Sequence, residues 1–400
     1  MAGLYIHIPF CRHKCAYCDF FSAPVRGDVV EQYLDALLAE WRLRRHELGS
    51  DPITTLYIGG GTPSMVPLNA MRRFMEALGR EIPLGTLSEA TIEANPEDIT
   101  AESIAAYRAM GFNRISVGIQ SFDSGQLDAV DRRHTPQASR DALRALSLSG
   151  INYSADLIYG LPGQSTAQWQ ENLAELLSYR PPHFSSYLLS YEPGTRLYAR
   201  LMKGEVEEAS DALAQQMYAI LCEAADSHGY HHYEISNLAL PGREAIHNSS
   251  YWRYTPYLGL GTGAHSFDGT LRRFNPTNIK QYIATLAGGR PFFRVDDETA
   301  VNRFNDYIIT SLRTTAGFST RFAAERFGAE AVKAFMRNAA PLLASGRLLP
   351  ASETLPGTTN APESASTAPE SASDTRLSIP RPLWLTSDAI LRDLILDSPN

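Results

Sequence analysis

The sequence predicts an α/β fold: a partial, TIM-like barrel of six βα units followed by a smaller, mainly helical C-terminal domain. Two observations predict it. Across residues 1–205, short β-type runs alternate six times with helix-length amphipathic segments, and this alternation is typical of a parallel sheet with right-handed crossovers. Beyond residue 205 the alternation ends, and from residue 295 the pattern is mainly helical.

The six predicted strands cover residues 3–8, 55–58, 89–93, 114–119, 153–159 and 184–189. The helices predicted between them cover residues 30–48, 68–78, 101–110, 135–149 and 167–178. In the first helix, Tyr33, Leu37 and Trp41 recur at helical spacing. Active sites of such barrels collect at the carboxyl ends of the strands, so we expect the chemistry in the loops that follow them.

The predicted barrel covers residues 1–205. The rest of the chain divides into three parts. Residues 206–294 are expected to complete the barrel, with a helix over 209–227, a strand over 233–235 and a loop over 238–270. Residues 295–350 and 377–400 are predicted to form the helical domain, with helices over 301–312, 329–343 and 388–396. Residues 351–376 repeat Ala-Pro-Glu-Ser-Ala-Ser and carry no aromatic residue. This segment cannot bury enough apolar area to offset its ordering entropy, so it is predicted to be a disordered insertion.

The composition is that of an ordinary globular protein. The 400 residues are 44% hydrophobic and 20% charged, which allows two or three domains and a substantial core. The net charge of −8 gives no electrostatic reason to expect nucleic-acid binding. No stretch approaches the roughly 18 uninterrupted apolar residues of a membrane span. Four cysteines and the lack of a secretory signal indicate a cytoplasmic setting, with any membrane contact peripheral.

Three cysteines follow the first predicted strand at the spacing C-x3-C-x2-C: Cys11, Cys15 and Cys18. Clustered thiolates are soft ligands for iron or zinc. Iron–sulfur clusters are more often held by four cysteines, but Cys222, the remaining cysteine, lies far away in a predicted helix, where a small buried hydrophobe is expected. A cubane on three cysteines would leave one iron open to a small-molecule ligand.

Two other interpretations of these cysteines remain open. One is a structural zinc site, which needs a fourth ligand; His7 or His13 is close enough in the sequence to supply it. The other is a disulfide, which a reducing compartment disfavours.

Glycine or polar residues follow the next predicted strands. The run Gly59-Gly60-Gly61-Thr62-Pro63 forms a turn in which missing side chains let a ligand approach the backbone. Glu93, Gln120 and Asp156 end or follow later strands. Each of the three alone could cap the next helix. A carboxylate or amide at three successive strand ends is hard to explain by packing, so together they are expected to line one mouth.

The C-x3-C-x2-C loop resembles that of the radical S-adenosylmethionine (SAM) superfamily. The run from Tyr5 to Cys11 and the glycine run narrow the resemblance to the branch that contains oxygen-independent coproporphyrinogen III dehydrogenase and a haem chaperone. The resemblance implies a 4Fe–4S cluster on the three cysteines, SAM at the barrel mouth, and reductive cleavage of SAM to a 5′-deoxyadenosyl radical. It also implies SAM contacts at Tyr5, Tyr17, Gly60, Gly61, Thr62, Glu93, Gln120, Arg132 and Asp156.

Two positions distinguish the members of this branch. The dehydrogenase carries a further cysteine two residues after the third, where this chain has Phe20; the missing thiol argues against porphyrinogen decarboxylation. The run from His247 to Trp252 resembles the H-N-x-x-Y-W motif of the haem chaperone, in which the histidine is implicated in haem ligation. Imidazole is a good axial ligand for haem iron, although a His-Asn pair can also stabilise a loop by hydrogen bonding. His265 is either a second ligand or a cofactor-pocket residue.

The resemblance therefore implies a haem chaperone that carries haem to client haemoproteins at or near the cytoplasmic membrane, with dimerisation linked to the cluster. The alternative is the dehydrogenase itself, a radical SAM oxidoreductase of haem biosynthesis. A third interpretation is a zinc-stabilised binding protein without a redox role.

Overall fold

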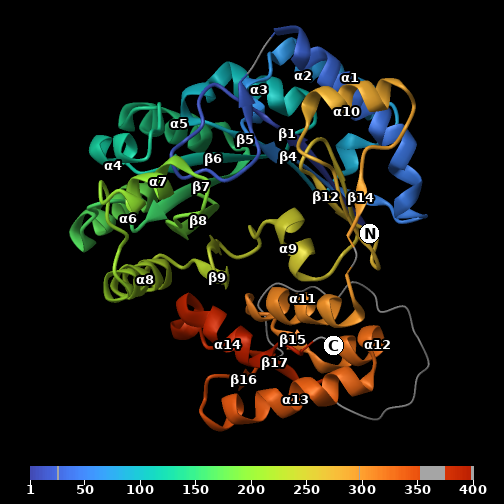
Figure 1. The fold of residues 1–400 in the computed structure, drawn as a ribbon. Helices are drawn as coiled ribbons and strands as arrows, with labels where there is room; N and C mark the ends of the chain where they lie inside the picture. The colour runs from blue at the N-terminus through green and yellow to red at the C-terminus, as the bar shows by residue number, and fades with distance from the viewer. Residues whose placement is uncertain (25–26, 297, 352–373, 398–400) are drawn as a thin grey trace.

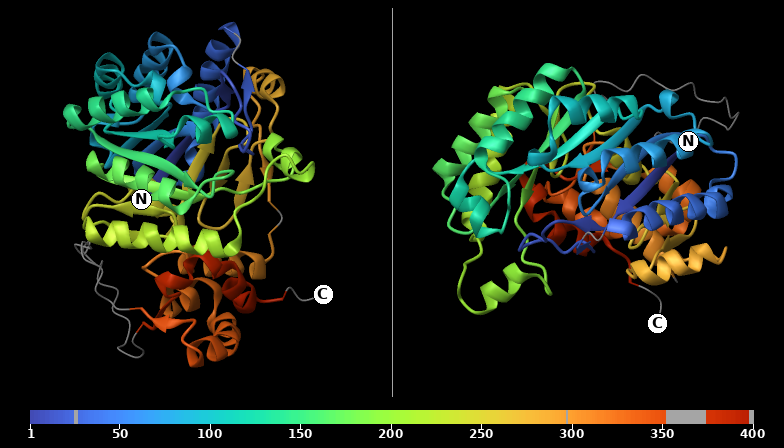
Figure 2. Two further views of the ribbon diagram at one scale, coloured as in Figure 1. Left: turned by 90° about the vertical axis from the view of Figure 1, so that its left-hand side faces the viewer. Right: turned by 90° about the horizontal axis from the view of Figure 1, so that it is seen from above.

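The computed structural model describes residues 1–24, 27–296, 298–351 and 374–397. Six strands form a curved parallel run in the order β1 (Ala2–Ile8), β4 (Ile53–Gly60), β5 (Glu89–Ala94), β6 (Arg114–Gln120), β7 (Asn152–Tyr159) and β8 (His183–Leu188). The helices α1 (Gly27–Arg44), α2 (Leu68–Gly79), α3 (Ala101–Ala109), α5 (Pro136–Ser149) and α6 (Thr166–Ser178) connect them and cover the outer face (Figures 1 and 2). The predicted six-unit partial barrel is confirmed.

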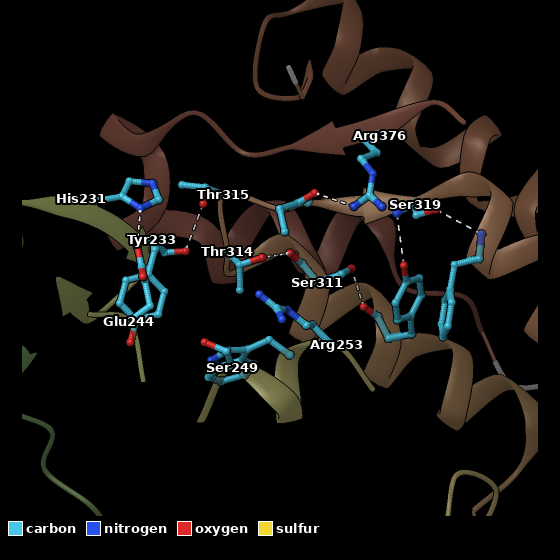
Figure 3. A pocket seen from close by; sticks show the side chains of 15 residues that line it. His231, Tyr233, Glu244, Ser249, Arg253, Ser311, Thr314, Thr315, Ser319 and Arg376 are labelled. Atoms are coloured by element: carbon cyan, nitrogen blue, oxygen red, sulfur yellow. Dashed lines mark hydrogen bonds and ion pairs between the residues drawn. The ribbon is translucent and has the colours of Figure 1, made fainter. Parts of the chain in front are cut away.

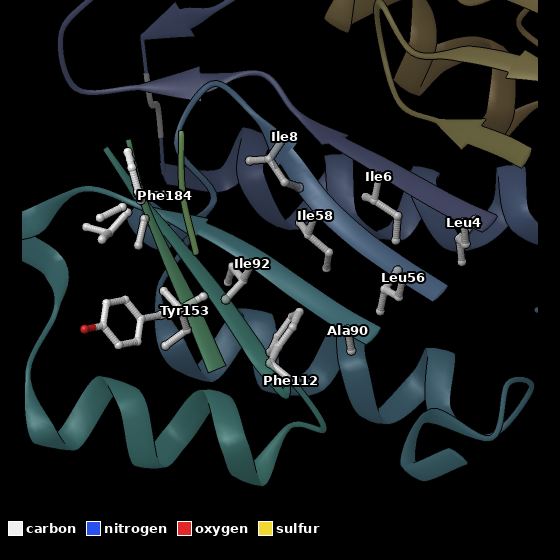
Figure 4. Close-up of a cluster of buried hydrophobic side chains, with 14 of the residues drawn as sticks. Leu4, Ile6, Ile8, Leu56, Ile58, Ala90, Ile92, Phe112, Tyr153 and Phe184 are labelled. Atoms are coloured by element: carbon white, nitrogen blue, oxygen red, sulfur yellow. The ribbon is translucent and has the colours of Figure 1, made fainter. Parts of the chain in front are cut away.

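The two faces of these strands differ in chemistry. Leu4, Ile6 and Ile8 of β1 and Leu56 and Ile58 of β4 pack in the main core (Figure 4). Because side chains alternate along a strand, the residues between them face the barrel interior. On β5, β6 and β7 this interior face is polar yet buried, carrying among others Glu89, Thr91, Arg114, Ser116 and Ser154. Burying polar groups costs free energy unless they find partners, so this interior face is where a functional site is expected.

The sheet continues past both ends of the parallel run. Beyond β8 lie β10 (Asn237–Ala239) and β9 (His231–Glu234); beyond β1 lie β11 (Tyr257–Leu260), β12 (His265–Phe267), β13 (Arg272–Phe274) and β14 (Arg294–Val295). The helices α4 (Ser124–Ala129), α7 (Arg196–Met202), α8 (Asp211–Ser227) and α10 (Ile279–Ala287) flank it. The predicted loop over 238–270 is wrong, because this stretch contains β10, β11, β12 and the helix α9 (Ile246–Trp252). Elements this short offer too few positions for a periodic pattern.

The C-terminal part packs below the barrel in Figure 1. It contains α11 (Ala300–Leu312), α12 (Thr320–Phe327), α13 (Ala329–Ala344) and α14 (Ser387–Leu394) around a small sheet of β15 (Phe318–Ser319), β17 (Arg376–Ser378) and β16 (Leu349–Pro350). Among the residues that the structure describes, none of the helices has both the length and the apolar character needed to cross a membrane.

The predicted insertion over 351–376 falls mostly outside the described residues, which omit 352–373. Its ends need correction. The Ala351 amide donates to the Arg376 carbonyl at 2.8 Å, and the Asp374 carboxylate accepts from the Ser319 hydroxyl at 2.8 Å. Ala351 and residues 374–376 therefore belong to the packed C-terminal part.

Candidate cluster and cofactor site

The three cysteines lie on the wall of one cavity of about 490 Å³ at the carboxyl ends of the strands. Their loop is anchored between the first and third thiols by Ala16, which is fully buried. The Ala16 amide donates to the Val130 carbonyl at 3.0 Å, and its carbonyl accepts from the Leu197 amide at 2.8 Å. The small apolar residue thus fixes the loop while the cysteine side chains on either side turn toward the cavity.

The thiols are close enough to influence one another. Burial raises the pKa of Cys18 to about 11, and the neighbouring Cys15 and Cys11 add to the rise; burial also raises the pKa of Cys11. Arg132 Nη1 donates to Cys15 Sγ at 3.5 Å. Thiolates here need a compensating positive charge, and a bound cluster would supply it. Three soft donors on one cavity wall fit an iron–sulfur cluster.

The predicted zinc alternative has no support in this geometry. Within the described ranges, no three His, Cys, Asp or Glu side chains converge on a point that would hold a single metal ion. Both ring nitrogens of His7 are engaged, Nδ1 with the Tyr5 hydroxyl at 3.0 Å and Nε2 with the Phe21 carbonyl at 3.2 Å. His13 is exposed and its Nε2 lies 3.1 Å from Arg196 Nη2.

The glycine run fixes the cysteine loop as well as leaving room in the cavity. The Gly61 amide donates to the Ile8 carbonyl at 2.8 Å. A Cβ on Gly61 would lie 2.7 Å from the Phe10 carbonyl oxygen and 3.0 Å from Cys11 Sγ, and a Cβ on Gly60 would lie 2.5 Å from the His7 ring. Glycine is thus required for the close approach of the two loops.

Two half-buried carboxyl groups face the cavity, Glu93 from β5 and Asp156 from β7, with β6 between them. Glu93 accepts from the Tyr57 hydroxyl at 2.7 Å and from the Gly60 amide at 3.0 Å, yet burial raises its pKa to about 7. Burial raises the pKa of Asp156 to about 6, against hydrogen bonds from Ser185 and Ser116 that lower it. Strongly perturbed carboxyl groups in a cavity are typical of a functional site.

Gln120 and Arg132, which line the same cavity, each have a polar side-chain atom without a hydrogen-bond partner among the described residues. The two atoms, Gln120 Oε1 and Arg132 Nε, are buried. Gln120 also adopts a positive φ of 65°, a conformation that costs free energy for a residue other than glycine. Arg132 Nη2 donates to the Gly118 carbonyl at 2.7 Å, which aims the guanidinium along the cavity. Buried polar atoms of this kind fit a ligand with several donors and acceptors.

The structure brings most of the predicted SAM contacts together. The predicted residues that line the cavity are Tyr17, Gly60, Gly61, Thr62, Glu93, Gln120, Arg132 and Asp156. Tyr5 does not line it: its ring lies one layer deeper, stacked on Tyr57 with centroids 6.2 Å apart.

Residues at the end of β8 were missed by the sequence analysis. Tyr187 and Leu188 line the cavity and are exposed at its rim, as is Phe20, which is 63% exposed. Their place at the carboxyl end of the sixth strand was the available signal, since neither residue carries a charged or amide group. Together with Phe20 they give the mouth an apolar edge.

His247 lies inside the barrel and away from the cavity wall. Its Nδ1 shares a hydrogen bond with Thr55 Oγ1 and its Nε2 with the Tyr251 hydroxyl, each at 2.8 Å. The side chain is fully buried, and burial lowers its pKa to about 3. The prediction that His247 ligates haem iron does not fit this conformation, because neither ring nitrogen is free. His265 lies on β12 with its ring stacked on Phe274, also outside the cavity wall.

A partial βα barrel with a three-cysteine loop at its mouth defines a radical SAM protein. A family model described as the radical SAM superfamily matches residues 5–176. The fold is similar to a solved structure of coproporphyrinogen III oxidase (HemN) from Escherichia coli, itself titled a radical SAM enzyme, with a TM-score of 0.77 over 98% of this chain and 90% of that chain at 21% identity.

Curated relatives narrow the assignment. The heme chaperone HemW of Bacillus subtilis is 35% identical over 82% of this chain and 87% of that protein. HemW of Mycobacterium tuberculosis is 33% identical over 83% of this chain and 87% of that protein, and HemW of Escherichia coli is 37% identical over 66% and 69%. The chain belongs to the HemW family. Radical SAM proteins use a 4Fe–4S cluster and SAM, which agrees with the donor set described above.

Proposed function

We propose that this protein is a haem chaperone, which binds haem and passes it to client haemoproteins. The observation that carries the proposal is Phe20. This exposed ring stands at the rim of the cavity, two residues after Cys18, where the dehydrogenase has a further cysteine. The curated relatives are described as heme chaperones, and an apolar ring at this position favours binding a porphyrin over transforming one.

The mouth of the cavity has the chemistry that haem requires. Phe20, Tyr187 and Leu188 form an exposed apolar rim, which suits the face of a large aromatic ring. Lys14 and Arg133 lie on the same rim, exposed and outside the ion pairs formed among the described residues, although the charge of Lys14 also acts on the Cys18 thiol; cations there suit the two propionates of haem. We therefore propose that the residues of this rim would contact haem.

The cavity residues would hold the other two cofactors. Cys11, Cys15 and Cys18 would ligate the 4Fe–4S cluster, and Gly60 and Gly61 would let SAM approach the backbone. When bound, the cluster and SAM supply one-electron chemistry. The remaining contacts to SAM would be made by Tyr17, Thr62, Glu93, Gln120, Arg132 and Asp156, all of which line the cavity.

The assignment extends to the cellular setting and to the division of the chain. We propose a cytoplasmic protein with clients at or near the membrane, forming dimers linked to the cluster. Residues 1–205 would carry the cofactors, 206–294 would complete the barrel, and 295–351 with 374–397 would form a separate C-terminal domain.

Haem titration of rim variants tests the proposed function. Phe20→Ala should weaken haem binding about tenfold, the effect of losing a buried aromatic contact, and leave the iron content of the cluster unchanged. Leu148→Ala is the matched control, because Leu148 is an exposed apolar residue on α5 away from the rim. Equal haem affinity in the wild type and Phe20→Ala would contradict the proposal that haem binds at this rim.

A further inference from the structure

We infer that His247 is a positioning residue for the cofactor cavity: it supports the ring of Tyr57, and Tyr57 holds the Glu93 carboxylate in place for SAM. The inference rests on the SAM site proposed above. It gives the histidine of the H-N-x-x-Y-W run a role other than iron ligation.

The helix α9 places His247 at the amino ends of the strands. Two amides at its start donate to the buried Glu89 carboxylate, Ile246 N at 2.7 Å and His247 N at 3.2 Å. Glu89 begins β5, and Glu93 lies near the end of the same strand. Residues at positions i, i+2 and i+4 of a strand share a face, so Glu89 and Glu93 point into the same interior at two levels.

A stack of rings joins these two levels. The His247 ring lies against Tyr57 with centroids 5.3 Å apart and an interplanar angle of 26°. Tyr5 stacks on Tyr57 at 6.2 Å and 30°, and the Tyr57 hydroxyl donates to Glu93 Oε1 at 2.7 Å. A continuous path of contacts therefore runs beneath the cavity, from α9 to the Glu93 carboxylate on its wall.

The His247 ring is itself held rigidly. Thr55 and Tyr251 occupy both of its nitrogens at 2.8 Å. A Cβ on Gly3 would lie 3.1 Å from His247 Cε1, so there is little free space behind the ring. A fixed ring on one side of Tyr57 limits how far the phenol can tilt, and thereby fixes the donor to Glu93.

The other face of α9 turns toward a second cavity, of about 250 Å³, between the barrel and the C-terminal part (Figure 3). Ser249, Trp252 and Arg253 line that cavity, whereas His247 and Tyr251 face the barrel. The two ends of the H-N-x-x-Y-W run thus contact different parts of the molecule, and its histidine belongs to the layer beneath the SAM cavity.

The test measures SAM affinity, cluster content and haem affinity on the same anaerobically reconstituted full-length protein. His247→Ala should weaken SAM binding about tenfold, because the void under Tyr57 lets the Glu93 donor move, and should leave haem affinity and iron content unchanged. His247→Phe keeps a ring under Tyr57 and should restore SAM affinity to within about threefold of the wild type. The change that SAM causes in the electron paramagnetic resonance spectrum of the reduced cluster should follow the same order.

Two further comparisons separate positioning from general damage. His183→Ala removes an equally buried histidine on β8, which bonds Tyr233 at 2.8 Å, and should leave SAM affinity unchanged. Tyr57→Phe should weaken SAM binding by itself, and adding His247→Ala to it should cost little more, since the histidine acts through the tyrosine.

Glu93→Gln tells the two possible failures apart. Unchanged SAM affinity in Glu93→Gln would overturn the proposed SAM site, and this inference with it. Loss of affinity in Glu93→Gln but not in His247→Ala would overturn the positioning role alone. Loss of haem binding in His247→Ala with SAM affinity retained would also overturn the positioning role. That result would favour haem ligation by His247 instead.

Discussion

At the scale of one residue, Glu93 shows that the proposed SAM cavity lowers the stability of the fold, because a carboxyl group on its wall is desolvated. It is a half-buried carboxyl whose pKa desolvation raises to about 7, although Tyr57 and Gly60 donate hydrogen bonds to it. The sequence placed Glu93 at a strand end, and polar residues at the ends of the next two strands predicted that it lines the mouth. The family resemblance implied a SAM contact for Tyr5 and haem ligation for His247. A motif match does not give depth in the fold, and both side chains lie in the layer beneath Glu93.

The raised pKa of Glu93 makes a prediction about stability. The folded protein holds the Glu93 proton more tightly than the unfolded chain, so this group's contribution to the free energy of unfolding falls as pH rises from about 4.5 through about 7. Glu93→Gln does not titrate. Relative to the wild type without SAM, the variant should therefore gain stability between pH 5 and about pH 8, as measured by urea unfolding. Glu102→Gln, at an exposed position on α3, should show no such trend; a flat difference for Glu93→Gln would contradict the raised pKa.

The cysteines give a second prediction at this scale. Replacing Cys11, Cys15 or Cys18 by Ala should abolish the roughly four iron and four sulfide per chain expected of a cubane. Cys222→Ala is the matched control, because this thiol lies on α8, 3.9 Å from His232 Nδ1 and away from the cavity. Iron and sulfide analysis after anaerobic reconstitution checks it. Loss of the cluster in Cys222→Ala would contradict the three-cysteine assignment.

At the scale of elements, the long strands and helices of the barrel could be predicted, and the short elements could not. All six parallel strands were found within a few residues of their predicted bounds, because apolar residues recur at alternate positions along them and a helix-length segment follows each of the first five. The region from β10 to β12 was expected to be a loop. Its strands have three or four residues each, and their pairing depends on contacts with β8 and β1 that are distant in the sequence.

The contact between the glycine turn and the cysteine loop makes the third prediction. Gly61→Ala should lower cluster content, because its Cβ would meet the Phe10 carbonyl at 2.7 Å and Cys11 Sγ at 3.0 Å and push the two loops apart. Gly85→Ala is the control, since no atom lies within 4 Å of its added Cβ. Iron analysis beside thermal unfolding distinguishes the two. Full cluster content in Gly61→Ala would show that the loops tolerate separation.

At the scale of the whole molecule, the small sheet β15-β17-β16 of the C-terminal part joins segments that are distant in the sequence. Ala351 and Arg376 are hydrogen-bonded neighbours, so the described residues on the two sides of the 352–373 gap lie close together. The Asp374 carboxylate also accepts from the Arg321 amide at 3.0 Å. Composition alone placed 374–376 in the insertion, because these pairings are long-range and leave no local pattern.

The fourth prediction follows from that geometry. Replacing 352–373 by a short Gly-Ser linker should leave the midpoint of thermal unfolding nearly unchanged, because the two ends already meet. Asp374→Ala should instead lower the stability by about 1–3 kcal/mol, the cost of leaving buried donors without an acceptor. Thermal unfolding of the two variants checks both statements. An unfolded linker variant would show that the replaced residues are needed for packing.

The central claim is that this barrel carries haem and does not transform its precursor. One measurement tests it most directly: haem titration and a coproporphyrinogen III conversion assay on the same cluster-loaded sample, with reductant and SAM supplied. Phe20 at the rim and membership of the HemW family predict stoichiometric haem binding and no formation of protoporphyrinogen IX. Efficient conversion of coproporphyrinogen III, or the absence of haem binding, would contradict the chaperone assignment.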